Sequence, residues 1–199
     1  MNDFTESEKQ ELKSFLNNIR GAVAEEIKSS PAGSSQDSAF FEHCKDWLDP
    51  GEGTFEPCPI ELTVNGQDIK IEARCTDKLD GDGILSLLVS DYVDEDELIG
   101  IRNSVISPMI NKATNFFQTA INVPGFSKQI SGEGYEAAGK LAEDISRKFA
   151  DGDIKQLNVV VLTNRQRLDQ DFNENITIEG IKVHETIYDL SQLMELEVK

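Results

Sequence analysis

The chain has 199 residues, of which 37 are Asp or Glu and 19 are Lys or Arg, so its formal charge is −18. Its length and its 38% hydrophobic residues argue against intrinsic disorder and predict one domain, or one domain with an appendage. The acidic excess argues against a broad nucleic-acid-binding surface, because Lys and Arg carry phosphate binding. It does not exclude a small local basic patch.

The sequence indicates neither a membrane span nor a zinc site. No stretch approaches the ~18 consecutive apolar residues of a membrane span, and the N-terminus lacks a signal pattern, so we expect a soluble cytoplasmic protein without a membrane partner. Cys44, Cys58 and Cys75 are widely spaced and form no CxxC pair. We therefore expect buried or half-buried thiols in a reducing compartment, and no zinc site.

The N-terminal part of the chain predicts two helices. Residues 5–29 have the apolar spacing of an amphipathic helix, and Thr5 and Glu8 have the spacing of a capping box. A loop rich in Ser, Gly and Pro (29–38) then separates this helix from a second one over 38–48.

The apolar period then changes to two, which indicates strands. Residues 57–64 and 69–73 alternate in polarity, and Asn65-Gly66 between them is typical of a type I′ hairpin turn. A second turn at 80–83 precedes the apolar segment 84–93, which is typical of a central strand.

The second half of the chain predicts further helices and strands. The acidic run 94–97 has the composition of a helix start, and an apolar helical pattern continues to Ile121, with a kink expected at Pro108. The remaining elements are expected at 134–149 (helix), 157–163 (strand), 164–175 (polar loop), 181–187 (strand) and 189–196 (helix).

These elements predict an α/β fold with a mixed central sheet flanked by helices. Their order, a helix, a three-strand meander, a helix and a fourth strand, is similar to the αβββαβ core of the restriction-endonuclease-like PD-(D/E)XK fold. We expect two parts, an N-terminal helix with its linker (1–37) and a nuclease-like α/β domain (38–199).

Motifs of other site classes do not fit. A calcium loop centred on Gly83 would put Lys78 and Val89 at positions that need acids. Lys140 is followed by Leu where a phosphate-binding P-loop needs Ser or Thr. With two histidines in the chain, Ser-His or Cys-His catalysis has few candidates, and we interpret His184 as an ordinary strand residue.

Three separated segments resemble one protein family in the same order. They are KIEARCTDKLDGDGILSLLVSDYVDEDEL (70–98), NVVVLTNRQRL (158–168) and GIKVHETIYDLSQL (180–193). Residues 38–196 as a whole resemble the N-terminal region of abortive infection phage resistance (AIPR) proteins. The resemblance implies a role in prokaryotic phage defence. Because family members are generally much longer, the chain is either an N-terminal fragment or a free-standing homologue.

The nuclease resemblance implies where a metal site would lie. In that fold an acid on the second strand and an acid-x-Lys on the third hold Mg²⁺ and activate water. Glu72 falls near the second-strand position, but Leu88 and Ser90 occupy the acid-x-Lys positions. An active centre would therefore use Glu72 and Asp91 as catalytic residues, and Glu72, Asp80 and Asp91 as metal ligands.

Some of these residues also have ordinary structural interpretations. Glu72 alternates with Ile71 and Ala73 and would face solvent on a half-buried strand. Four basic residues would either form a local phosphate-binding spot or only increase the solubility of the protein. They are Arg102, Lys112, Arg165 and Arg167.

Three functional hypotheses follow. The leading one is a catalytically inert nuclease-fold domain that acts in recognition, regulation or assembly and needs no cofactor. Its partner would be another protein or a C-terminal effector domain of the same protein, with a homo-oligomer and a weakly bound nucleic acid as open alternatives. The second is a Mg²⁺-dependent nuclease that cleaves DNA or RNA. The third is an acidic decoy that mimics DNA phosphates.

Overall fold

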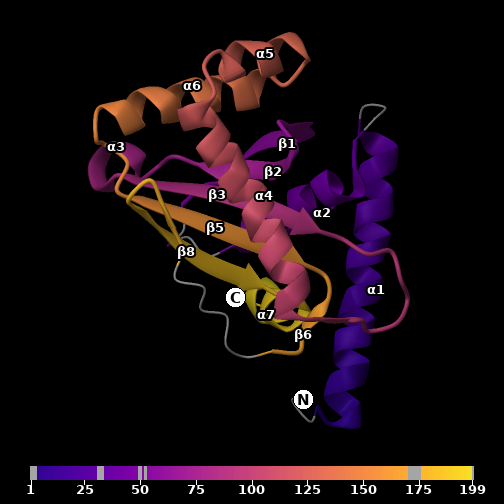
Figure 1. Ribbon diagram of the computed structural model, residues 1–199. Helices are drawn as coiled ribbons and strands as arrows, with labels where there is room; N and C mark the ends of the chain where they lie inside the picture. The colour runs from indigo at the N-terminus through magenta and orange to yellow at the C-terminus, as the bar shows by residue number, and fades with distance from the viewer. Residues whose placement is uncertain (1–3, 31–33, 49–50, 52, 170–175, 199) are drawn as a thin grey trace.

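A mixed β-sheet forms the centre of the protein. We use a computed structural model, which describes residues 4–30, 34–48, 51, 53–169 and 176–198. In this part of the chain the sheet has six strands (Figure 1). In spatial order they are β1 (Glu56–Val64), β2 (Gln67–Cys75), β3 (Ile84–Asp91), β5 (Gln156–Thr163), β8 (Ile181–Tyr188) and β7 (Thr177–Ile178). A separate two-stranded sheet pairs β4 (Gly100–Ile101) with β6 (Gln166–Arg167).

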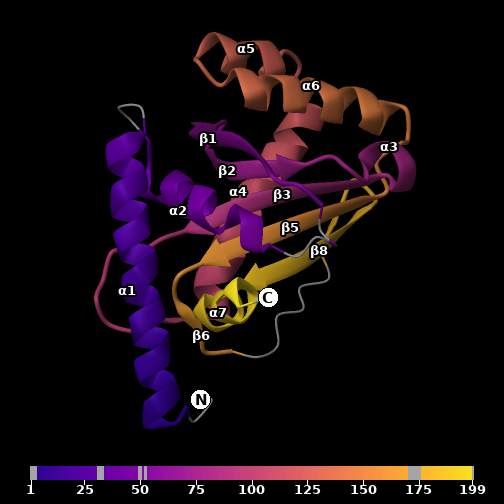
Figure 2. The same cartoon turned by 180° about the vertical axis from the view of Figure 1, so that it is seen from behind.

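Helices cover both faces of this sheet, which confirms the α/β prediction. They are α1 (Glu6–Ser29), α2 (Gln36–Cys44), α3 (Leu79–Asp82), α4 (Asn103–Asn122), α5 (Phe126–Gly132), α6 (Glu136–Ala150) and α7 (Leu190–Glu197). In Figure 1 α4 lies in front of the sheet, and Figure 2 shows α2 and α7 on the opposite face. Among the described residues, no helix combines the length and apolar character needed to cross a membrane.

The strand connections follow the sequence prediction. β1, β2 and β3 form an antiparallel meander, and β3, β5 and β8 run parallel to one another. Asn65 and Gly66, between β1 and β2, both have positive φ angles, of 51° and 79°, which is the requirement of the predicted type I′ turn.

The hydrophobic core has two parts, one on each face of the sheet. The α4 side contains Leu85, Leu87 and Val89 of β3 together with apolar residues of α4, α5 and α6. The α1 side contains Leu88 of β3 and Val160 of β5 together with apolar residues of α1, α2 and α7. Alternate residues of β3 therefore face opposite layers, and the strand is buried on both sides, as its continuous apolar sequence predicts.

The N-terminal helix α1 packs directly on this core. Thr5 and Glu8 form the predicted capping box, with the Thr5 N–H donating to Glu8 Oε2 at 2.7 Å. The buried residues of α1 are Leu12, Phe15, Leu16, Ile19 and Val23. They belong to the same cluster as residues of β3 and β5, so α1 shares its core with the sheet.

The prediction of a helix from the acidic run 94–97 onward is wrong. Residues 94–97 are not helical, and α4 begins only at Asn103. The acidic side chains pair with α1 instead, because Lys13 Nζ lies 2.8 Å from Glu97 and Arg20 Nε lies 2.9 Å from Asp94. The acidic run is therefore part of a loop that is held against α1 by ion pairs.

Short elements were also missed. The predicted turn at 80–83 is the single helical turn α3, ended by Gly83 with a φ of 73°. The helix α5 was not predicted, and β6 lies in the expected polar loop 164–175, of which residues 170–175 are outside the described part.

The three thiols are free and buried, as the sequence predicts for Cys44, Cys58 and Cys75. Burial raises the pKa of the Cys58 thiol to about 11, and burial also raises that of Cys44. Both thiols therefore stay protonated at neutral pH, which makes them poor nucleophiles.

We predict that Gly83→Ala destabilises the fold by at least about 1 kcal/mol, because its positive φ disfavours a side chain. An added β-carbon would also collide with the Asp153 carbonyl oxygen. Urea denaturation measures the change. The matched control is Gly81→Ala, where a β-carbon meets nothing within 4 Å and the change should stay within about 0.5 kcal/mol. Equal midpoints for the two variants would contradict the prediction.

Candidate functional site

Glu72 is buried, so the expectation that it faces solvent is wrong. Only 5% of the residue is exposed. Ile71 packs in the α4-side cluster, whereas Ala73 packs in the α1-side cluster. The strict alternation of β2 is therefore interrupted between these positions, and Glu72 lies at the interruption.

Two residues at the start of α2 hold the polar side chains of β2. The Ser38 hydroxyl donates a hydrogen bond to Glu72 Oε2 at 2.7 Å. The Lys70 ammonium donates to the Asp37 carboxylate and lies 3.9 Å from Glu72 Oε1. Asp37 Oδ1 also accepts the backbone N–H of Tyr92, just after β3, at 2.7 Å. We name Asp37, Ser38, Lys70 and Glu72 the clasp cluster, because it ties α2 to β2 and to the end of β3.

A cleft opens beside the clasp cluster. Its volume is about 760 Å³, and both Ser38 and Glu72 line it. The other lining residues are Ser34, Ser35, Glu42, Pro59, Ile60, Glu61, Gly134 and Tyr135. Concave sites with a few convergent polar groups, such as a buried carboxylate and hydroxyl groups, are where proteins commonly bind ligands.

The environment of Glu72 changes its protonation. Burial raises the pKa of Glu72 to about 7, against the hydrogen bond from Ser38 and the charge of Lys70, while Asp37 and Glu61 raise it further. Burial disfavours the Lys70 ammonium, but the hydrogen bond and charge of Asp37 still raise the pKa of Lys70 above its ordinary value. Near neutral pH the cluster can therefore exchange a proton on Glu72 while Lys70 stays cationic.

Asp91, the second predicted catalytic residue, lies apart from Glu72. Arg165 donates two hydrogen bonds to its carboxylate, from Nε at 2.8 Å and from Nη2 at 2.7 Å, and the Thr163 hydroxyl donates a third at 2.8 Å. Asp91 follows Val89 by two positions on β3 and so points toward the α4 side, whereas Glu72 contacts α2 on the other face. Its carboxylate is held in a structural ion pair.

The predicted metal ligands are also separated along the sheet. Asp80 lies in α3 just before β3, is paired with Lys148 and has an 87% exposed side chain. Asp91 is the last residue of this eight-residue strand, which spans ~25 Å at about 3.3 Å per residue. Within the described ranges, no group of three His, Cys, Asp or Glu residues could hold a metal ion.

Leu88 and Ser90, which the nuclease resemblance puts at the acid-x-Lys positions, are both buried on β3. Ser90 Oγ has no hydrogen-bond partner within the described part of the chain. Neither side chain can supply the charge that a nuclease needs there.

The clasp cluster shows what sequence reasoning missed. Lys70 precedes Glu72 by two residues on the same strand, and this spacing could have indicated that the two side chains are neighbours. Asp37 and Ser38 are more than thirty positions away in the sequence, and no local pattern connects them to β2.

Three of the four basic residues considered for a phosphate-binding spot lie beside carboxylates. Arg165 is held by Asp91, and Arg102 Nη1 lies 3.8 Å from Asp169. Lys112 instead lies 4.0 Å from Glu61 on β1. Arg167, the fourth, belongs to β6.

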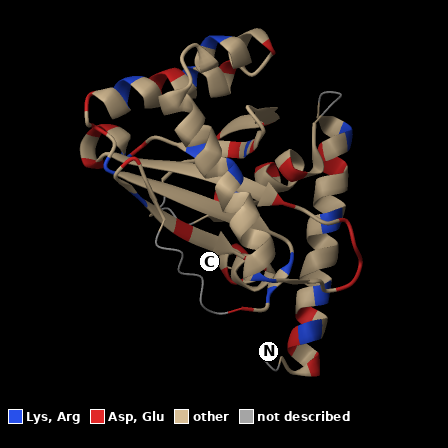
Figure 3. Cartoon of the chain, in the orientation of Figure 1, with Lys and Arg blue, Asp and Glu red and all other residues tan. Residues whose placement is uncertain are grey.

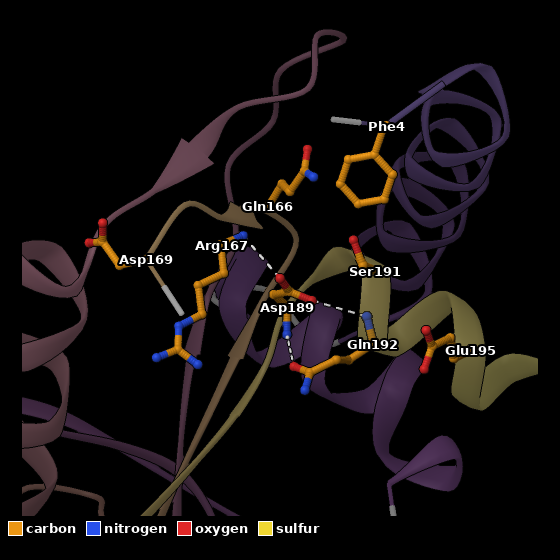
Figure 4. Close-up of a pocket in the computed structure, with 8 residues that line it drawn as sticks. All are labelled: Phe4, Gln166, Arg167, Asp169, Asp189, Ser191, Gln192 and Glu195. Atoms are coloured by element: carbon orange, nitrogen blue, oxygen red, sulfur yellow. Dashed lines mark hydrogen bonds between the residues drawn. The ribbon is translucent and has the colours of Figure 1, made fainter. Parts of the chain in front are cut away.

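A second cavity, of about 360 Å³, lies between β6 and α7 (Figure 4). Asp189 dominates its polar contacts, accepting the backbone N–H groups of Arg167 and Gln192, each at 3.0 Å. The backbone N–H of Asp189 in turn donates a hydrogen bond to Gln192 Oε1 at 3.2 Å. Asp189 is therefore the N-cap of α7, and its role here is structural.

We predict that Asp91→Asn destabilises the fold by about 3 kcal/mol, because it leaves Arg165, whose side chain is only 17% exposed, without its ionic partner. Urea denaturation measures the loss. The control Asp94→Asn removes a more exposed ion pair, with Arg20, and should cost less than about 1 kcal/mol. Equal losses would show that the Asp91 pair is no stronger than a surface pair.

We predict that Glu72→Gln flattens the pH dependence of stability between pH 5 and 8. In the folded state the pKa of Glu72 is raised from 4.5 to about 7, so the wild type loses stability as pH rises through this window. At about 1.4 kcal/mol per pKa unit the total loss is about 3 kcal/mol. Urea unfolding at several pH values measures it.

The control for this experiment is Glu25→Gln on α1, whose side chain is 75% exposed. This variant should keep the pH dependence of the wild type. Equal slopes for wild type and Glu72→Gln would show that Glu72 titrates as an ordinary carboxyl group.

The family comparison agrees with the resemblance seen in the sequence. The family model described as "Abortive infection phage resistance protein N-terminal domain" matches residues 40–195. No curated protein and no solved structure gives a significant match. The matched range covers most of the chain and includes Lys70, Glu72, Asp91 and Arg165. The chain therefore belongs to the abortive infection phage resistance protein N-terminal domain family, which supports a role in phage defence.

Proposed function

We propose that this domain acts in recognition, regulation or assembly within a phage-defence protein, and that it has no active nuclease centre of its own. Family membership supports the phage-defence part of the proposal. The absence of a nuclease centre is supported by the ion pair between Arg165 and Asp91. This pair leaves Glu72 without a carboxylate partner from β3.

The strand order supports a restriction-endonuclease-like core as part of this proposal. After α2, the strands β1, β2 and β3 form the meander, α4 follows, and β5 pairs parallel to β3. In such a core the third strand would supply an acid and a lysine. Leu88 cannot ligate a metal ion, and Ser90 has no ammonium group to steady an attacking hydroxide.

A domain of this kind would act through a partner. We propose a protein partner or a C-terminal effector domain of the same protein, in the cytoplasm, and we keep self-association as an alternative. The cleft beside the clasp cluster is the concave surface that such a partner would contact.

A second candidate function is a metal-dependent nuclease centred on the clasp cluster. The observation in its favour is that Glu72 is buried beside Lys70 and lines a cleft, so a carboxylate and a lysine occur together. In this version Asp37, and not Asp91, would be the second carboxylate. A Mg²⁺ ion would then have to displace the Lys70 ammonium from Asp37.

The acidic decoy gains no support from the structure. A mimic of DNA needs rows of like charge on one face. Lys and Arg are instead interspersed with Asp and Glu along α1 and α6 (Figure 3).

We predict that the purified chain does not cleave plasmid DNA or RNA with Mg²⁺ or Mn²⁺, because its two predicted catalytic carboxylates lie on opposite faces of the sheet. Gel electrophoresis measures cleavage, and titration calorimetry with millimolar metal should show no binding heat.

Matched variants distinguish the two candidate functions. If cleavage occurs and Glu72→Gln abolishes it while Asp91→Asn retains it, the inert domain is ruled out and a centre on the clasp cluster is supported. Cleavage that survives in both variants points to a contaminating nuclease and leaves the inert domain as the conclusion.

A further inference from the structure

Three basic side chains meet at a cavity beside Asp80, one of the predicted metal ligands. This cavity has a volume of about 250 Å³ and lies where the end of β2, the short helix α3 and the last turns of α6 come together. Its lining residues are Arg74, Thr76, Leu79, Asp80, Asp144, Arg147 and Lys148. In a chain of net charge −18, this cavity combines three cations with two carboxylates.

Two of the three cations are more buried than the carboxylates that pair with them. Lys148 has a 14% exposed side chain, and its partner Asp80 is 87% exposed. Arg74 is 22% exposed, and its partner Glu56, 3.2 Å away, is 63% exposed. Ion pairs with such exposed carboxylates are weak, so these carboxylates can turn into solvent when a stronger anion arrives.

The third cation, Arg147, is more exposed than its partner Asp144, with side-chain exposures of 59% and 49%. Arg147 Nη2 lies 3.1 Å from Asp144, which is one helical turn away on α6 and is about half exposed. Asp80 is influenced by both α6 cations, because the hydrogen bond from Lys148 and, to a smaller extent, the charge of Arg147 lower its pKa. The positive charges of Lys148 and Arg147 therefore both act on the carboxylate of Asp80.

Arg74 also has an unused donor. Its Nε is buried and has no hydrogen-bond partner among the residues that the structure describes. Buried donors are nearly always satisfied by protein, water or a bound ion, so this one calls for an acceptor.

A stabilising role at the helix end explains only part of the arrangement. Arg147 and Lys148 lie in the last turn of α6, where cations interact favourably with the helix dipole. Arg74 comes from β2 and has no such role. Two guanidinium groups, an ammonium group and the Thr76 hydroxyl are the donors that proteins use for phosphate oxygens.

We propose that Arg74, Arg147 and Lys148 form a binding site for a phosphate group, which displaces Asp80 and Asp144 from the cations. The phosphate can come from a nucleic-acid backbone or from a free phosphate compound. This proposal goes beyond the role proposed above and does not depend on it.

Inorganic phosphate is the first probe. At constant ionic strength, phosphate should raise the melting temperature of the wild type relative to chloride, because a ligand of the folded state stabilises it. Arg74→Gln combined with Lys148→Gln should lose this increase. The control Lys28→Gln, which removes an exposed ion pair on α1, should retain it.

A gain of binding tests the site without removing any cation. Asp80→Asn and Asp144→Asn remove exposed competitors, and together they should tighten phosphate binding by about two- to fivefold, the range that weak exposed pairs allow. An absence of any phosphate effect in the wild type, an effect that persists without Arg74 and Lys148, or unchanged affinity in the Asn variants would each overturn the proposal.

A labelled DNA or RNA oligonucleotide identifies the source of the phosphate. Binding that phosphate competes away and that weakens with added salt assigns the site to a nucleic-acid backbone. A response to phosphate without oligonucleotide binding assigns it to a small phosphate compound. Both results support the site.

Discussion

Burial of the central sheet on both faces is the constraint that decides what its polar residues can do. A strand covered on both sides has no solvent to satisfy its charged or hydrogen-bonding groups, so each such group needs a partner inside the protein. Asp91 has Arg165 and Thr163, and Glu72 has Ser38 and Lys70. Except for Lys70, these partners come from parts of the chain far away in sequence. The polar residues of the sheet therefore fix how distant segments are joined.

The carboxyl ends of the parallel strands illustrate this joining. Asn164, just after β5, accepts the backbone N–H of Val93 at 2.9 Å and donates to the Val93 carbonyl at 2.8 Å. The carbonyl of Arg165 accepts the N–H of Leu190 at the start of α7 at 3.1 Å. Ligands of α/β proteins commonly bind at this edge of the sheet. Here the polar groups are occupied by the protein itself, which favours the cleft beside α2 as the candidate site.

Local sequence patterns predicted the helices, strands and turns that are determined by neighbouring residues. The alternation of β1, the Asn65-Gly66 turn and the apolar spacing of α1 all depend on neighbouring residues, and they were found from the sequence. The start of α4 was misplaced because Asp94 and Glu97 obtain their partners from α1, some eighty positions earlier. A helix start rich in acids and a loop held by ion pairs have the same composition, so composition could not separate them.

The candidate site was predictable only in part, for the same reason. Glu72 was identified as a residue of interest, but its burial depends on an interruption of β2 and on two side chains of α2. The ion pair of Asp91 was not predicted, because its partner Arg165 lies just after β5, 74 positions later. A charged residue next to a predicted strand can thus be interpreted as a metal ligand or as one member of an ion pair. The sequence does not distinguish these two interpretations.

The clasp cluster also bears on where this domain begins. The family match starts at residue 40, and the composition of the chain suggested a boundary between residues 37 and 38. Both positions separate Lys70 and Glu72 from Asp37, and the family match leaves Ser38 outside as well. A buried charge that loses its partner costs about 3–5 kcal/mol, a large share of the stability of a domain this size. The start of α2 is therefore part of the folded unit, and α1, which packs on the same cluster as β3 and β5, belongs with it.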